Sequence, residues 1–164
     1  MNAKIVVYSW TGNAAACAVA LQNALSAEPF LLVEKKERAG NRGFAMGGFQ
    51  ASVGKNTELK ALPDLSDCDT LVLGMPLWAS TTPPAINTFL KECDIKGKIV
   101  YAYVTQMGTD IPKKLEKKLK KTIEQKGGVF RHMFVVSIPR GKQMTVEAAQ
   151  PRADRWAERI RSGE

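Results

Sequence analysis

The residues best suited to chemistry form a short turn near the start of the chain: Ser9, Trp10, Thr11, Gly12 and Asn13. The turn separates an apolar run from a segment with helical apolar spacing. Backbone N–H groups at a helix N-terminus converge on one point, and the helix dipole adds about half a positive charge there. Hydroxyl and amide side chains add donors, and Gly12 permits conformations that other residues resist. A phosphate would suit this turn, although an ordinary helix cap formed by Thr11 or Asn13 explains the same pattern.

Two later loops add groups that could contact a flat ligand. The first, GMPLWASTTPP, contains Trp78, which could form a wall for an aromatic ring or lie half-buried beneath the end of a sheet. The second, TQMGTD, offers backbone amides, and it could bind the edge of a heterocycle or simply form a turn. Together with the first turn, these loops supply what a mononucleotide with a large ring would need.

The elements that must position these loops alternate along the chain. The hydrophobic pattern predicts strands at residues 4–8, 30–33, 70–74, 98–105 and 129–138, and helices at residues 14–26, 83–92, from about 111, and 145–161. Such alternation implies right-handed crossovers and a parallel sheet with helices on both faces. Ligands of these sheets bind outside the carboxyl ends of the strands, where all three loops are expected.

One segment interrupts the alternation. Residues 40–55, GNRGFAMGGFQASVGK, are rich in glycine, and we expect a long loop or a short irregular element there rather than a core strand.

Length and composition limit the class of protein. A chain of 164 residues that is 45% hydrophobic suits a single domain over residues 1–164 with a sizeable core. No apolar run approaches the about 20 residues of a membrane span, and the N-terminus lacks a signal-peptide pattern, so we expect a soluble cytoplasmic protein. Cys17, Cys68 and Cys93 are widely spaced, which favours free, mostly buried thiols over a metal site. His132 lies in an apolar run and is expected to be structural.

The chain is basic, with a net charge of +8. Much of this charge lies in PKKLEKKLKKTIEQKGG, where apolar residues recur every four positions and lysines fill the other faces. This pattern predicts an amphipathic helix whose basic face serves solubility or docks a partner. An acidic protein would fit that face better than nucleic acid, because no aromatic residues interleave with the lysines.

The motifs resemble those of the flavodoxin-like family. YSWTGNAAACA resembles the flavodoxin phosphate loop, LSDCDTLVLGMPLWASTTPPAINTFL resembles the third strand with its flavin-facing loop and helix, and KIVYAYVTQMG resembles the fourth strand and loop. The resemblance covers nearly the whole chain. It implies an α/β three-layer sandwich with a five-stranded parallel sheet of order 2-1-3-4-5, and FMN as cofactor. The chain looks closer to variants with a glycine-rich insert after the second strand, here residues 40–55, than to long-chain flavodoxins, whose insertion interrupts the fifth strand.

The resemblance also implies the residues that would contact FMN. Ser9, Trp10, Thr11, Gly12, Asn13 and Ala14 would hold the phosphate. Pro76, Leu77, Trp78 and Ala79 would face one side of the isoalloxazine ring. Thr105, Gln106, Met107 and Gly108 would border its other side and its polar edge.

The chain departs from the family pattern in three ways. Ala14 stands where the phosphate motif usually ends in threonine, which removes a hydrogen bond of about 0.5–1.5 kcal/mol. Trp10 replaces a small or polar residue and could crowd or cover the phosphate. The basic charge contrasts with the acidic flavodoxins, so an acidic redox partner docking near the flavin edge is the matching expectation.

Three functions fit these observations. The leading hypothesis is an electron-transfer protein that carries electrons on non-covalently bound FMN and needs no catalytic acid or base, no metal and no nucleic acid. An FMN-dependent NAD(P)H:quinone oxidoreductase, with residues 40–55 as part of a substrate pocket or lid, is the second. A flavin-free interaction module that uses the basic face is the third.

Overall fold

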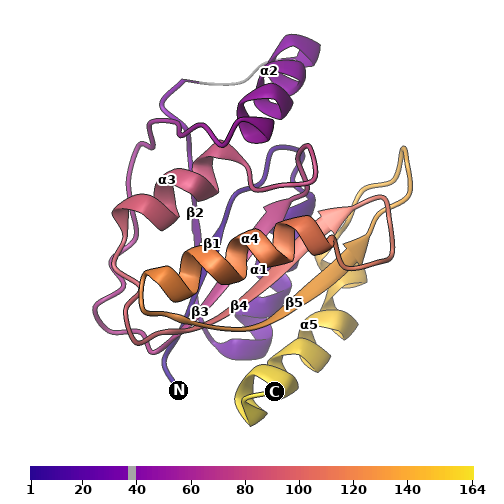
Figure 1. The fold of residues 1–164 in the computed structure, drawn as a ribbon. Coiled ribbons are helices and arrows are strands. Elements are labelled where there is room, and N and C mark those ends of the chain that lie inside the picture. The colour runs from indigo at the N-terminus through magenta and orange to yellow at the C-terminus, as the bar shows by residue number, and fades with distance from the viewer. Residues whose placement is uncertain (37–39) are drawn as a thin grey trace.

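The computed structural model describes residues 1–36 and 40–164 and contains a five-stranded parallel sheet (Figure 1). The strands are β1 (Ala3–Val7), β2 (Pro29–Leu31), β3 (Thr70–Pro76), β4 (Ile99–Gln106) and β5 (Val129–Ser137). Their order is β2-β1-β3-β4-β5, and every neighbouring pair is parallel. The strand order and the α/β fold class predicted from the sequence are therefore confirmed.

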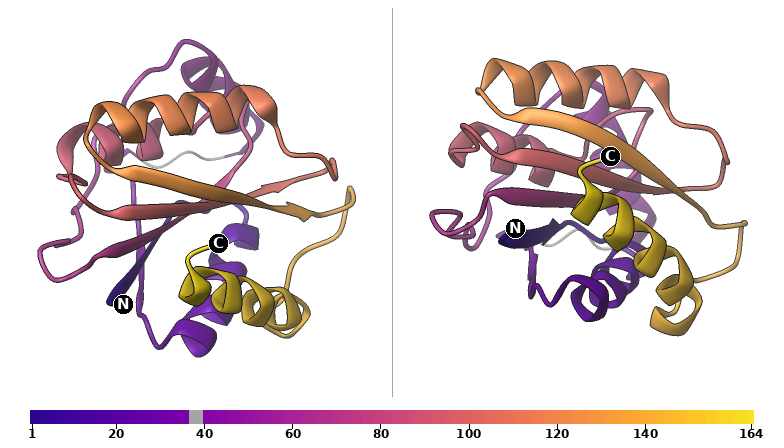
Figure 2. Two further views of the ribbon diagram at one scale, coloured as in Figure 1. Left: turned by 60° about the horizontal axis from the view of Figure 1, so that its bottom comes forward. Right: turned by 90° about the horizontal axis from the view of Figure 1, so that it is seen from below.

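Helices cover both faces of the sheet (Figure 2). They are α1 (Asn13–Leu25), α2 (Gly40–Ser52), α3 (Pro84–Glu92), α4 (Lys113–Gln125) and α5 (Val146–Ser162). Helices α1 and α5 pack together on one face, α3 and α4 cover the other, and α2 lies beside α3. These layers form the expected three-layer sandwich.

Two hydrophobic cores result from the alternation of side chains along each strand. On β3, Leu71 and Leu73 point toward α3 and α4, whereas Val72 points toward α1 and α5. All three side chains are fully buried. Because both faces of the sheet are covered, the strands read in the sequence as nearly continuous apolar runs.

Residues 40–55 do not form the loop or irregular element expected from their glycines. Most of the segment is helix α2, which ends at Ser52. Glycine costs about 1 kcal/mol in a helix but does not forbid one. One glycine has a packing reason, since a Cβ atom on Gly47 would lie only 2.5 Å from the Trp78 ring. The glycine therefore allows close approach of the helix backbone to that indole.

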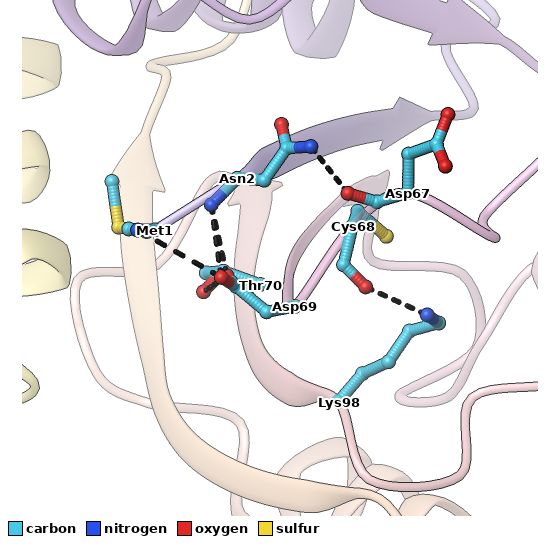
Figure 3. Close-up of polar contacts among 7 residues, drawn as sticks. All are labelled: Met1, Asn2, Asp67, Cys68, Asp69, Thr70 and Lys98. Carbon is cyan, nitrogen blue, oxygen red and sulfur yellow. Dashed lines mark hydrogen bonds and ion pairs between the residues drawn. The ribbon is translucent and has the colours of Figure 1, made fainter.

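The amino ends of the strands are tied together at the edge away from the candidate loops (Figure 3). The Asn2 backbone N–H donates to the Asp69 carboxylate at 3.0–3.1 Å, and the N-terminal ammonium lies 3.8 Å from the same group. Lys98 Nζ donates to the backbone carbonyls of Leu65 and Cys68, each at 2.7 Å. These contacts join the starts of β1, β3 and β4, so they support the fold without touching the loops at the opposite edge.

The cysteines and the histidine are packing residues. Cys17, Cys68 and Cys93 are free and buried, as predicted, and burial raises the pKa of the Cys17 and Cys93 thiols to about 11. The ring of His132 lies 4.7 Å from that of Phe134. Across residues 1–36 and 40–164, no helix is long and apolar enough to cross a membrane, and no cluster of side chains could hold a metal ion.

Candidate functional site

A pocket of about 570 Å³ opens at the carboxyl ends of the strands. The loops after β1, β3, β4 and β5 line it, as expected for a parallel sheet of this order. Its volume lies within the about 300–1,000 Å³ typical of small-molecule sites. Ten of the residues predicted for the FMN site line this pocket: Trp10, Thr11, Asn13, Pro76, Leu77, Trp78, Thr105, Gln106, Met107 and Gly108.

The first turn leaves the N-terminus of α1 without a side-chain cap. Gly12 is the residue before the helix, in the left-handed region at φ +87°, and no side chain of the described residues caps the helix. Thr11 and Asn13, the expected capping residues, bond elsewhere: Asn13 Nδ2 donates to Thr11 Oγ1 at 3.1 Å. The ordinary capped helix that the sequence also allowed is therefore not formed. Uncapped amides and the helix dipole favour an anion at this position.

A second observation at the same turn points to a ligand. Ser9 Oγ is buried and has no hydrogen-bond partner within the described parts of the chain. A buried hydroxyl without a partner loses its bonds to water, at a cost of about 1–3 kcal/mol. An anion held by the α1 amides would supply an acceptor for this hydroxyl, so the residues present fit a phosphate group.

Asn13, which lines the pocket, also links two of the loops around it. Its Oδ1 accepts from the Met144 backbone N–H at 2.8 Å, in the loop that joins β5 to α5. Asn13 thus couples the first turn to the β5–α5 loop. It positions both loops at the mouth of the pocket.

The aromatic residues pack against one another rather than standing free. Trp78 is only 5% exposed, and its ring meets Tyr8 and Trp10 edge-on, at centroid distances of 5.6 and 6.2 Å. Most of the Trp78 side chain is therefore buried, as one of the two interpretations expected, although part of the residue lines the pocket. Met107 lines it as well and is 71% exposed. Both residues therefore offer apolar surface to a flat ring.

The turn after β3 carries backbone strain. Ala79 and Ser80 have φ values of +46° and +59°, and Trp78 and Thr81 exchange two backbone hydrogen bonds across them. Such values are unfavourable for residues with a Cβ atom and persist where the surroundings impose them.

Lys118, on α4, helps to hold this turn in place through hydrogen bonds from its side chain. Its Nζ donates to Thr81 Oγ1 at 3.0 Å, Thr82 Oγ1 at 2.6 Å and Asn87 Oδ1 at 3.2 Å. Burial, with a smaller effect of Lys114, lowers the pKa of this ammonium. The turn that borders the pocket is therefore anchored by a partly buried cation on neutral acceptors.

The end of β4 offers an unused acceptor. Gln106 Nε2 donates to the backbone carbonyls of Gly108 and Asp110 at 3.1 and 2.6 Å, which fixes the amide. Its Oε1 is buried and lacks a hydrogen-bond partner among the residues that the structure describes. A heterocycle that presents an N–H group to this side of the pocket would satisfy it.

Four predicted residues lie beside the pocket without lining it: Ser9, Gly12, Ala14 and Ala79. Ala14 is buried, and its carbonyl accepts from the Tyr103 hydroxyl at 2.8 Å. Conversely, the sequence reasoning missed the β5–α5 loop, which contributes Ile138, Pro139, Arg140, Gly141 and Lys142. The signal was present, because the loop after any strand of a parallel sheet lies at the same edge.

Comparisons with known proteins agree with this arrangement. A family model described as flavodoxin matches residues 49–156, whereas no curated protein matches. A provisionally assigned flavoprotein from Bacteroides uniformis is 19% identical, with 96% of this chain and 97% of that chain covered and a TM-score of 0.72. A flavoprotein in complex with FMN from Lactobacillus acidophilus is 17% identical, with 82% and 92% covered and a TM-score of 0.68. The chain belongs to the flavodoxin family.

Proposed function

We propose that this protein binds FMN non-covalently and carries electrons between redox partners. The observation that carries the proposal is the pairing of an uncapped helix N-terminus with the buried, unpartnered Ser9 Oγ at one side of the pocket. The flavoprotein from Lactobacillus acidophilus, whose fold is similar, binds FMN and supports the choice of ligand. When bound, FMN supplies reversible one- or two-electron redox chemistry.

Different residues of the chain would bind different parts of FMN. The first-turn amides of α1 and Ser9 would hold the phosphate, because both offer donors without acceptors. Gln106 Oε1 would accept from the polar edge of the ring. Leu77 and Met107 would border its faces and exclude water.

An electron carrier fits the lining better than an independent enzyme. No aspartate, glutamate, histidine, cysteine or tyrosine is among the described residues that line the pocket, so that lining offers no carboxylate, imidazole, thiol or phenol as a general acid or base. No described residue of α2 lines it either. The lid or substrate pocket that a quinone oxidoreductase would build from residues 40–55 therefore gains no support. We also propose a cytoplasmic location, since free thiols persist in reducing compartments.

A turnover assay separates the carrier from the enzyme. The protein loaded with FMN is mixed with NADH or NADPH and a soluble quinone, and oxidation of the nicotinamide is followed by absorbance. We expect at most stoichiometric reduction of the bound flavin and no sustained turnover. The same sample reduced chemically should pass its electrons to a one-electron acceptor. Sustained, catalytic oxidation of NADH or NADPH would contradict the carrier function while leaving FMN binding intact.

A further inference from the structure

The positive charge of the chain is concentrated in one continuous segment. Residues 106–142 contain ten lysines and arginines and three acidic residues, a balance of +7 out of the total +8. The rest of the chain holds 14 basic and 13 acidic residues and is nearly neutral. The charge is thus a property of the end of β4, α4, β5 and the following loop. It is not spread evenly for solubility.

The fold places two of these cations, Arg140 and Lys142, in the lining of the pocket, and three more on the helix that follows a pocket-lining loop. Lys113, Lys114 and Lys117 are exposed near the N-terminus of α4, which directly follows the pocket-lining loop after β4. Arg140 and Lys142 lie in the β5–α5 loop, which lines the same pocket. The two loops emerge at the same edge of the sheet in both figures of the fold (Figure 1, Figure 2). We call these five residues the basic rim.

One backbone and one side-chain hydrogen bond join the β4–α4 and β5–α5 loops where they begin. The Ile138 N–H donates to the Gln106 carbonyl at 2.8 Å, and Ser137 Oγ donates to the Met107 carbonyl at 3.1 Å. The β5–α5 loop therefore begins directly beside the β4–α4 loop. A partner that docks there would meet both parts of the basic rim at once.

The β4–α4 loop, which precedes the lysines of the basic rim in the chain, also carries exposed apolar side chains. Met107 is 71% exposed and Ile111 is 38% exposed, both in the β4–α4 loop. Asp110, between them in sequence, is the one acidic residue of this loop. Apolar contacts at the centre with charged residues around them are the usual anatomy of a protein–protein interface.

The lysines of the basic rim make no ion pair with any residue that the structure describes. Within residues 1–36 and 40–164, the only ion pair on α4 joins Lys120 to Glu124 at 3.9 Å, farther along the helix. The apolar face of α4, formed by Leu115, Leu119 and Ile123, is fully buried in the core. The helix therefore presents charge alone and has no apolar face left to insert into a lipid surface.

We propose that the basic rim, together with Met107 and Ile111 of the β4–α4 loop, is the docking surface for an acidic redox protein. The surface adjoins the pocket, so a partner seated on it would face the mouth of the proposed FMN site. The redox role of this partner rests on the proposed function, whereas the docking itself does not. Complementary charge mainly sets the rate of encounter and the choice of partner, and salt weakens it.

A charge-reversal variant tests the surface. Lys113→Glu, Lys114→Glu and Lys117→Glu are combined. All three side chains are exposed, and the first two lie in the first turn of α4, where acidic residues suit the helix dipole, so folding is preserved. The matched control combines Lys36→Glu, Lys60→Glu and Arg155→Glu, which are exposed elsewhere and change the net charge equally. The probe is an acidic [2Fe–2S] ferredoxin in its oxidised form. Binding is measured by calorimetry at about 50 mM and about 300 mM NaCl.

We expect saturable binding of ferredoxin to the wild type at low salt. Its affinity should fall by about tenfold or more in the basic-rim variant and should change by less than about threefold in the control. Equal losses in both variants would show a general charge effect and overturn the proposal. Tighter binding of duplex DNA or phosphatidylserine vesicles than of ferredoxin would overturn it as well. FMN affinity is measured separately by quenching of flavin fluorescence. Failure of FMN binding with intact docking would reject the proposed function alone.

Discussion

The packing of α2 against Trp78 can be tested with a matched pair of substitutions on one helix. A Cβ atom on Gly47 would lie 2.5 Å from Trp78 Cζ3, at least about 1 Å closer than the optimum of about 3.5–4.0 Å for two carbons. A Cβ atom on Gly48 meets nothing within 4 Å in the described parts of the chain. Replacing glycine by alanine inside a helix gains about 0.5–1 kcal/mol, whereas overpacking costs about 1–3 kcal/mol. Gly48→Ala should therefore stabilise the protein, and Gly47→Ala should be less stable than Gly48→Ala by about 1–3 kcal/mol.

Equilibrium unfolding in urea, without flavin, measures both free energies of unfolding. In a Trp78→Leu background the indole ring is absent, so Gly47→Ala should raise the free energy of unfolding as much as Gly48→Ala does. The double-mutant cycle then isolates the contact between Gly47 and Trp78. FMN affinity should fall in Gly47→Ala alone, because the indole lines the pocket and must shift. Equal stability of the two alanine variants in the wild-type background would refute the placement of α2 on Trp78.

Three further substitutions probe the turn, the anchor and the histidine. Gly12→Ala should destabilise the protein by about 1–2 kcal/mol through its positive φ alone, since nothing lies near the added Cβ; unchanged urea unfolding would contradict that conformation. Lys118→Met should lower the stability by about 1–3 kcal/mol and weaken FMN binding, because it removes the ammonium that donates to the turn after β3. Lys121 is exposed, and the control variant Lys121→Met should change neither stability nor FMN binding. Burial and Arg159 lower the pKa of His132 below 6.5, so the unfolded chain takes up the proton more readily and this residue costs stability as pH falls through 6.5. Thermal unfolding at about pH 5 and about pH 7.5 should show that acidification lowers the stability of His132→Gln less than that of the wild type. Equal losses of stability would contradict the lowered pKa of His132.

The fold could be predicted because its strands are apolar and its helices amphipathic in the expected places. The run ending at Gly74 reads as a strand on composition alone, since both of its faces are buried. Helix α2 was missed because glycine was read as a helix breaker, whereas Gly47 serves a tertiary contact. Such a contact depends on which residue folds against the helix, and local sequence does not record it.

The candidate site was predicted in outline and missed in detail for the same reason. The first turn could be recognised from its residue types, but the partners of Asn13 come from Thr11 beside it and from Met144, 131 residues away. The orientation of Trp78 is likewise set by Tyr8 and Trp10, which meet it only in the folded chain. Residue type indicates what a side chain can do, and tertiary structure decides which of those contacts it makes.

The central claim is that the first turn is a phosphate cradle, and paired titrations with FMN and riboflavin test it most directly. The two ligands differ by the phosphate alone. Hydrogen bonds to a charged group contribute about 1.5–3 kcal/mol each, so two or more of them predict binding of FMN at 1:1 stoichiometry and at least about a hundredfold more tightly than riboflavin. Ser9→Ala should narrow that ratio, and the exposed Ser162→Ala should not. Equal affinities for FMN and riboflavin, or no saturable binding of FMN, would contradict the account.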